Sequence, residues 1–365
     1  MASSVSAVHC RDSRATIATL MAWGGTHLAV DAASVAVALR ASSHETLSAV
    51  GAWGVVVAYN VLAFAGQAPL GLVTDRWRFP RLSAVAGCIL VACAVPAAAI
   101  GPILAVCLAG LGNALFHVGG GAISLSLTPG RATGPGLFVA PGALGVAIGV
   151  LVGRDGAMAT WPFLPVLAGA LVTLLAIKPP PIDYRRRRVT NLRGGFGLVL
   201  VLLCAAIAVR SIMGAVAVGP WKPDMTVVVF LALAAVAGKA SGGILADRFG
   251  WLRVATTAML VAMPFVVLGM NTVPLAIAGM VLLQIPMSIT VAAIARLFPG
   301  APAFSFGLAS LVLVIGAIQV ATVPLAIFGH PWVSGGLLLT STAALFAGLR
   351  LLLGAPRADV GPHSR

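Results

Sequence analysis

Long runs of apolar residues recur along the whole chain, and the short segments between them carry most of the charges. Each run has the roughly 20 residues that an α-helix needs to cross the hydrocarbon core of a bilayer. The runs are uniformly apolar and do not alternate with polar residues, as the shorter strands of a membrane barrel would. We therefore predict twelve transmembrane helices, at residues roughly 17–39, 48–70, 82–100, 103–126, 134–153, 159–177, 196–218, 224–244, 253–270, 273–294, 304–328 and 331–353.

Composition supports an all-α membrane protein. Hydrophobic residues make up 60% of the chain and charged residues 9%, whereas about 25% of the residues of a soluble domain are charged. The net charge of +14 comes from basic residues in short loops, without the contiguous basic face and stacking aromatics that nucleic-acid binding needs. We therefore expect the protein to lie in a lipid bilayer and not to bind nucleic acid.

The positions of lysine and arginine predict how the chain is oriented in the membrane. With the N-terminus inside, eighteen of the 23 basic residues fall in cytoplasmic segments, and the outer loops hold only Arg40, Arg154 and Lys222. Cytoplasmic loops carry the excess of positive charge, so we expect both termini in the cytoplasm and an even number of spans. The abundance of alanine, valine, glycine and arginine is typical of a GC-rich bacterial genome and hence of a cytoplasmic (inner) membrane.

One loop differs from the others in length and charge. Residues 178–195, KPPPIDYRRRRVTNLRGG, combine helix-breaking prolines with four consecutive arginines, which cannot enter the hydrocarbon core. We expect a basic cytoplasmic linker here. It divides the chain into an N-terminal six-helix half, residues 1–177, and a C-terminal six-helix half, residues 196–365.

A short motif occurs twice, each time after the second span of a predicted half. GLVTDRWRFPR at 71–81 is matched by GILADRFGWLR at 243–253, a constant offset of 172 residues. Such an internal repeat is typical of transporters built from two parallel repeats, with substrate bound between them at the bilayer midplane. The matching residues are Gly71, Asp75 and Arg76 in the first copy and Gly243, Asp247 and Arg248 in the second.

This repeated G-x-x-x-D-R motif resembles the signature of the major facilitator superfamily. The glycine lets two helices approach closely, and the aspartate can pair with an arginine or cap the next helix, latching the cytoplasmic end. Arg78 stands where the family usually has a glycine, and Pro80 interrupts the basic run. The resemblance implies the twelve-helix facilitator fold and a conformational latch at both copies.

Polar residues deep in the spans are costly in lipid and are therefore candidates for function. They lie in the first, fourth, seventh and tenth spans, which line the central cavity in the facilitator fold that the motif implies. Asp31 is the one acidic residue deep in a span, and it follows His27 by one helical turn. The full set is His27, Asp31, Asn113, His117, Arg210 and Gln284, with Trp23 as an aromatic residue in a cavity-facing span.

Three strings narrow the resemblance to the fosmidomycin-resistance-type branch of the superfamily: THLAVD at 26–31, GNALFHVGG at 112–120 and FVAPGALGVAIG at 138–149. The branch has a His-x-x-x-Asp in its first helix and a Phe-His in its fourth. Val118 and Val150 stand where prolines are usual. Members of the branch are mostly drug or metabolite exporters thought to use the proton gradient.

Asp31 is our candidate for the coupling proton, because a carboxyl group removed from water can take up and release a proton near neutral pH. His27 and His117 are candidate proton relays or substrate ligands. The alternative is that Asp31 only holds its helix in place. A buried Arg210 needs an anion, either Asp31 or an anionic substrate. Lys239 is expected to extend toward the cytoplasmic membrane surface.

Small residues at helical spacing mark one span. Gly142, Gly145, Gly149 and Gly153 suit close helix packing, expected between the two halves. An imperfect resemblance to a glycine-rich antiporter motif is the alternative.

The favoured function is secondary active transport by alternating access, with proton-coupled export of a small molecule first and uptake of a small anion as its rival. We expect a monomer without a cofactor. A membrane enzyme is disfavoured, because the spans hold one deep aspartate, no G-x-S-G and no phosphate-binding loop. No metal-ligand cluster is expected from two membrane histidines and one carboxylate. A receptor or scaffold without transport is the third class.

Overall fold

The structure is a computed structural model, and helices make up nearly all of its ordered backbone. It describes residues 2–44, 47–154, 159–184, 192, 194–221, 223–269 and 272–354, with the main chain alone at 2–13, 49 and 321. No β-strand occurs within these ranges. The all-α prediction is therefore confirmed.

Every predicted span coincides with at least one helix. In the first part of the chain these are α1 (Ala2–Ser42), α2 (Ala49–Asn60), the π-helical η1 (Val61–Ala65), α3 (Gln67–Trp77), α4 (Pro80–Ala97), α5 (Pro102–Leu127), α6 (Thr133–Gly153) and α7 (Phe163–Ala176). In the second part they are α8 (Gly195–Val218), the 3₁₀ turn η2 (Gly219–Trp221), α9 (Met225–Phe249), α10 (Trp251–Leu268), α11 (Val273–Gln284), α12 (Pro286–Leu297), α13 (Pro302–Thr322), α14 (Leu325–Gly329) and α15 (Pro331–Leu353).

Ten helical stretches in the described part of the chain are long and apolar enough to cross a membrane. The sixth predicted span corresponds to the shorter α7, which has 14 residues. The first span is α1, which has the length but carries His27 and Asp31, whose polarity lowers its mean hydropathy. The chain is therefore an integral membrane protein by length and composition.

Prolines explain where the predicted spans and the observed helices differ. The span predicted at 304–328 is not one helix, since α13 ends at Thr322 and α14 begins after Pro324. Proline fixes its own backbone and pushes the preceding residue into an extended conformation, and Val323 is indeed extended. The tenth span differs, because Ile285 between α11 and α12 keeps a helical backbone and Val273–Leu297 still forms one stretch long enough to cross a membrane.

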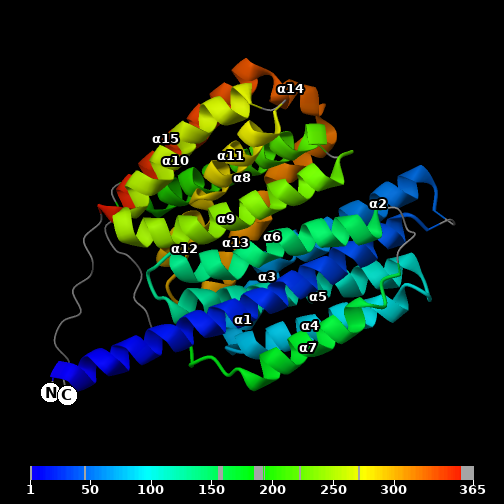
Figure 1. Ribbon diagram of the computed structural model, residues 1–365, viewed down its shortest axis with the longest axis horizontal. Helices are drawn as coiled ribbons and strands as arrows, with labels where there is room; N and C mark the ends of the chain where they lie inside the picture. The colour runs from blue at the N-terminus through cyan, green and yellow to red at the C-terminus, as the bar shows by residue number, and fades with distance from the viewer. Residues whose placement is uncertain are drawn as a thin grey trace.

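The helices pack in two groups that meet along a long interface (Figure 1). α1 packs on α5, α6 and α7, and α8 packs on α13 and α15. Between these groups α6 runs along α9, and α3 runs along α13. The linker predicted at 178–195 lies partly outside the described residues, at 185–191 and 193, so the division into two halves stays a prediction.

The four spaced glycines of α6 lie against α1, within the same predicted half. A Cβ on Gly145 would overlap the carbonyl oxygen of Leu28, and one on Gly149 would lie 2.7 Å from the carbonyl oxygen of Ala32. Close packing is therefore the role of this face. The expectation that it lies between the halves is wrong, because α6 presents a different face, including Gly136, to α9.

We predict that Gly145→Ala destabilises the protein by about 1–3 kcal/mol, because the added methyl group meets the α1 backbone and cannot be accommodated by a rotamer change. The control is Gly169→Ala in α7, where a Cβ would meet nothing within 4 Å. That substitution should be neutral or stabilise by up to about 1 kcal/mol, since alanine favours helix over glycine. Thermal unfolding of both variants in the same detergent tests this. Equal midpoints would contradict it.

Candidate functional site

Three polar side chains from two helices converge in the protein interior. His27 and Asp31 lie one turn apart on α1, with His27 Nε2 3.1 Å from Asp31 Oδ2. His117 on α5 brings its Nε2 to 3.6 Å from Asp31 Oδ1 and to 2.8 Å from His27 Nε2. All three residues are buried, with exposed fractions of 3%, 6% and 7%. The predicted coupling residues therefore form one cluster.

Backbone carbonyl groups fix the tautomers of both imidazoles. His27 Nδ1 lies 2.8 Å from the carbonyl oxygen of Phe138, and His117 Nδ1 lies 2.8 Å from that of Asn113. A carbonyl oxygen can only accept a hydrogen bond, so each Nδ1 carries a proton. In a neutral imidazole the other nitrogen then has a lone pair, and both Nε2 atoms point toward each other and toward Asp31.

A polar chain extends the cluster toward the second span. Asn113 Nδ2 donates to Asp31 Oδ1 at 2.8 Å and to Ser34 Oγ at 3.0 Å, and Tyr59 donates its hydroxyl to Ser34 Oγ at 3.0 Å. Asn113, predicted as a residue of the substrate cavity, thus lies beside Asp31, and its substrate role stays a prediction. The sequence reasoning missed Ser34 and Tyr59. Ser34 could have been found from its position one turn after Asp31, on the same helix face.

Aromatic rings enclose the imidazoles. The ring of His27 lies 4.7 Å from that of Phe138 and 5.8 Å from that of Phe116, centroid to centroid. Phe306 of α13 lies 6.3 Å from His117. These rings exclude water, so charges in the cluster interact in a low dielectric.

The cluster of His27, Asp31 and His117 could hold a metal ion, which was not expected from the sequence. The donor atoms of His27, Asp31 and His117 all lie within 4.8 Å of one another, which is close enough to hold one metal ion. The expectation that the chain has no metal-ligand cluster is therefore wrong as to geometry. Sequence reasoning missed it because the contact between α1 and α5 joins residues 90 positions apart.

Arg210 is buried on α8 and has neutral hydrogen-bond partners. Its Nη2 donates to Thr290 Oγ1 at 2.9 Å, and its Nε lies 3.4 Å from the carbonyl oxygen of Ala206. Asp31 is not among the partners of Arg210 within the described ranges. The sequence predicted that Arg210 pairs either with Asp31 or with an anionic substrate. The ion pair with Asp31 is not formed in this structure. Sequence reasoning missed Thr290.

Lys239 also belongs to the interior. It is half-buried on α9 and interacts electrostatically with Asp31, His117 and Arg210. The expectation that it extends toward the membrane surface is therefore wrong. The backbone at Lys239 packs closely on α6, since a Cβ on Gly136 would lie 2.8 Å from the Lys239 carbonyl oxygen.

Gln284 and Trp23 are the remaining candidates for the cavity. Gln284 is half-buried at the end of α11 and lies 3.6 Å from the sulfur of Met280. It packs on α9, where a Cβ on Gly238 would lie 2.9 Å from it. Trp23 is buried, and its indole nitrogen has no hydrogen-bond partner within the described part of the chain. A substrate role for either residue stays a prediction.

The first copy of the repeated motif joins α3 to α13. The carboxylate of Asp75 accepts hydrogen bonds from the backbone N–H groups of Ala303 at 3.1 Å and Phe304 at 2.8 Å. A Cβ on Gly71 would lie 2.6 Å from the carbonyl oxygen of Ala303, so only glycine allows this approach. Asp75 was predicted either to pair with an arginine or to cap a helix. It caps the N-terminus of α13, a helix far along the chain.

The second copy joins α9 to α6 in the same way. Asp247 accepts from the backbone N–H groups of Ala132 and Thr133, both at 2.9 Å, and a Cβ on Gly243 would overlap Ala132. A negative charge is favourable at a helix N-terminus. The two copies thus make equivalent contacts that hold the two groups of helices together at one end of the molecule.

The motif arginines do not take part in these contacts. Arg76 and Arg248 are exposed. Trp251 and Arg296 contribute instead and were not predicted as site residues. The indole nitrogen of Trp251 donates to Asp247 at 3.0 Å, and the Arg296 guanidinium lies over the Trp251 ring at 3.8 Å and donates to the carbonyl oxygen of Gly130 at 2.7 Å.

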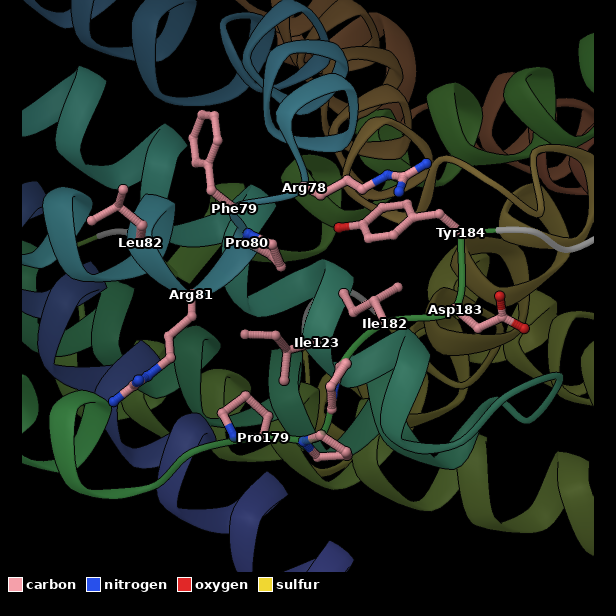
Figure 2. A pocket seen from close by; sticks show the side chains of 12 residues that line it. Arg78, Phe79, Pro80, Arg81, Leu82, Ile123, Pro179, Ile182, Asp183 and Tyr184 are labelled. Carbon is pink, nitrogen blue, oxygen red and sulfur yellow. The ribbon is translucent and has the colours of Figure 1, made fainter.

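A cavity of about 400 Å³ lies at the same end, between the loop that follows α3 and the chain after α7 (Figure 2). Its lining includes Arg78, Arg81 and the segment from Pro179 to Tyr184. The Arg78 guanidinium lies 5.5 Å from the centre of the Tyr184 ring. Burial, with the nearby charge of Asp75, raises the pKa of Tyr184 to about 12, so its phenol is neutral. This cavity is separate from the Asp31 cluster.

Comparison with known proteins identifies the fold. No family model and no curated protein sequence matches the chain. Among solved structures, the chain is similar to the fucose–proton symporter FucP of E. coli, with a TM-score of 0.68, 11% identity and coverage of 92% of this chain and 98% of that one. A structure of FucP in the outward conformation gives a TM-score of 0.70 at 12% identity, with 92% and 98% covered. A bacterial homologue of the iron transporter ferroportin, in an outward-facing state, gives 0.57 at 15% identity, with 93% and 98% covered.

The chain therefore has the fold of major facilitator transporters. At these identities the likeness shows the fold and leaves substrate, direction and coupling ion open to proposal. The narrower resemblance to the fosmidomycin-resistance-type branch stays a prediction.

Proposed function

We propose that this protein is a secondary active transporter that moves a small anionic solute together with protons by alternating access. The observation that carries this proposal is Arg210. Its guanidinium is 7% exposed and hydrogen-bonds only to neutral groups in the described part of the chain. A buried cation without an anion is costly, and an anionic solute would supply the missing charge.

A second cation supports an anionic solute. Lys239 interacts electrostatically with Arg210, so two positive charges act on each other in the protein interior. Like charges at close range repel unless an anion lies between them. A carboxylate or phosphate can accept hydrogen bonds from both a guanidinium and an ammonium group. We therefore assign solute binding to Arg210 and Lys239.

The cluster of Asp31, His27 and His117 is suited to hold the coupling proton. Two imidazole Nε2 atoms 2.8 Å apart repel each other if both carry lone pairs, and one shared proton removes that repulsion. Protonation also reduces the negative charge near the solute site, so a proton and an anion favour each other's binding. Favourable coupling of this kind corresponds to symport, since both ligands then cross together.

Proton-coupled export of a drug or metabolite is the second candidate. The observation that favours it is that no lysine or arginine forms an ion pair with Asp31 within the described residues. A cationic solute could therefore replace the proton at this carboxylate. Competition for one group corresponds to antiport.

Membrane placement follows from the fold and the charges. We assign the protein to the bacterial cytoplasmic membrane, as a monomer, with both termini inside. The carboxylate contacts of Asp75 and Asp247 would then close the cytoplasmic side, so the conformation is outward-facing. The similarity to two structures described as outward-facing supports this.

Transport by reconstituted protein tests the proposed function. Proteoliposomes with an inward proton gradient are incubated with a panel of radiolabelled small carboxylates, phosphates and organic cations. Wild type should accumulate at least one anion, and Arg210→Gln should lower that uptake by about 10–100-fold, because a charge-assisted hydrogen bond is lost. The control is Arg14→Gln, which removes an exposed arginine of α1.

Three other results of this transport assay would contradict the proposed anion symport. Full uptake by Arg210→Gln would remove the anion site from Arg210. Expulsion of a cation on acidification outside would establish antiport instead. Transport of no compound by folded protein would favour a receptor or scaffold.

A further inference from the structure

Three metal-ligating atoms converge at the centre of the buried cluster. His27 Nε2 and His117 Nε2 are 2.8 Å apart, and they lie 3.1 Å and 3.6 Å from the two oxygens of Asp31. An ion with tetrahedral bonds of about 2.0–2.1 Å holds neighbouring ligand atoms about 3.3 Å apart. One donor atom from each residue lies within 4.8 Å of the other two, so small side-chain shifts would bring three donor atoms onto one face of a coordination tetrahedron.

The tautomers are those that a metal site requires. Each Nδ1 donates to a backbone carbonyl oxygen, of Phe138 for His27 and of Asn113 for His117. This leaves each Nε2 free to donate a lone pair. Metal-binding histidines commonly donate their other nitrogen to a carbonyl or carboxylate, which fixes the ring and strengthens the ligand.

The surroundings support a formed site. Asn113 Nδ2 donates to Asp31 Oδ1 at 2.8 Å and orients the carboxylate. Gly142 leaves space beside the donors, since a Cβ there would overlap His27 Nε2 and lie 2.7 Å from Asp31 Oδ2. The rings of Phe116 and Phe138 exclude water around His27, which strengthens electrostatic binding of a cation.

We propose that His27, Asp31 and His117 form a binding site for one divalent first-row transition metal ion, of which Zn²⁺ is the reference. Two imidazoles and one carboxylate suit such ions rather than Mg²⁺ or Ca²⁺, which prefer oxygen ligands. Three protein ligands leave a fourth position of the ion for water or a solute. The site follows from the geometry alone and does not depend on which solute the protein carries.

Metal and proton must compete at this site. Both occupy the lone pairs between the two Nε2 atoms, so binding of the ion displaces the shared proton. Metal affinity therefore falls as the pH is lowered. At saturation the ion blocks proton coupling.

Equilibrium metal binding to the purified full-length protein tests the inference. The protein carries a tag without histidines, is stripped with a chelator in detergent, and is dialysed long enough for ions to enter the enclosed site. Mass spectrometry counts Zn²⁺ per chain, and the visible absorption of Co²⁺ reports the coordination. We expect one high-affinity ion per chain, with tetrahedral Co²⁺ absorption that disappears on acidification.

Substitutions locate the ion. His117→Gln should weaken binding more than about 100-fold, because loss of a supporting group alone costs about 10–100-fold. Asn113→Ala, which removes such a supporting contact, should weaken it about 10–100-fold. His330→Gln is the control, since His330 is an exposed imidazole at the start of α15.

Three results would overturn the proposal. They are no bound ion in folded wild type, unchanged affinity in folded His117→Gln, and loss of the ion in His330→Gln. If His117→Gln does not fold, the pH dependence of wild type and the Asn113→Ala variant decide the question. Because the readout is binding, failure of this site leaves the transport experiment unaffected.

Discussion

Replacing Asp31 by asparagine is expected to abolish transport driven by a pH gradient, with a loss of about 100-fold or more. Asparagine has nearly the same shape and can keep a hydrogen bond with Asn113, but it neither binds a proton nor carries a charge. The proton that we propose His27 and His117 share would then lose the carboxylate that lies 3.1 Å and 3.6 Å from their Nε2 atoms. The substitution thus removes the group that we propose to couple the proton to transport.

Solute exchange without a gradient should survive the same substitution. Arg210 and Lys239 remain in place, so preloaded proteoliposomes should still exchange labelled for unlabelled anion. The comparison of pH-driven uptake with exchange therefore separates coupling from binding. If Asp31 only holds α1 in place, both activities should fall together and the thermal unfolding midpoint should drop.

Asp224→Asn is the matched control for this prediction. Asp224 caps α9 by accepting from the backbone N–H groups of Thr226 at 3.0 Å and Val227 at 3.2 Å. Asparagine caps a helix about as well as aspartate, so this variant should transport like wild type. Unchanged pH-driven transport by Asp31→Asn would remove Asp31 from the coupling mechanism.

Removing both motif carboxylates, in an Asp75→Ala and Asp247→Ala double variant, is expected to open the end of the molecule that they hold closed. Asp75 accepts two backbone hydrogen bonds from α13, and Asp247 accepts two from α6. Hydrogen bonds to a charged group each stabilise by about 1.5–3 kcal/mol. Even a partial loss of about 3 kcal/mol shifts an equilibrium more than 100-fold.

Hydrogen exchange detected by mass spectrometry measures this opening directly. Amides at the N-termini of α6 and α13, including Thr133 and Phe304, should exchange much faster in the double variant. Exchange at the far ends of the same helices should change little. Transport should also fall, because a protein that cannot close this end cannot complete the cycle.

Asp224→Ala is the control for the double variant. It also removes a carboxylate that caps a helix, but Asp224 caps its own helix, at the opposite end of α9 from Asp247. Its effect should stay local to the start of α9. Equal exchange at α6 and α13 in all three proteins would show that the two motif carboxylates do not hold this end closed.

The helices could be predicted from the sequence because their cause is local. A run of apolar residues about 20 long must form a helix in lipid, whatever its neighbours do. The clearest error occurs where proline acts, at Pro324, which breaks a span that its hydropathy predicts to be continuous. The repeated motif likewise located the carboxylate contacts, since Asp75 and Asp247 both cap helices.

The partners of these residues could not be predicted, because they lie far along the chain. Asp75 contacts backbone groups 228 and 229 positions away, and a backbone N–H leaves no mark in the sequence. The motif arginines were expected to contribute, yet Trp251 and Arg296 take that position. Lys239 was expected at the membrane surface, but it interacts electrostatically with Asp31 and Arg210, which lie on other helices.

The sequence by itself determined that the chain spans a membrane, where its helices lie and which side chains are too polar for lipid to surround. Hydropathy, helix length and the cost of burying charge decide these properties, and all three can be read from neighbouring residues. The tertiary structure alone decided that His27, Asp31 and His117 share one centre, and that Arg210 lies apart from Asp31. Distances of about 3 Å between side chains depend on how whole helices pack, and glycines such as Gly142 and Gly145 set that packing through contacts with another helix.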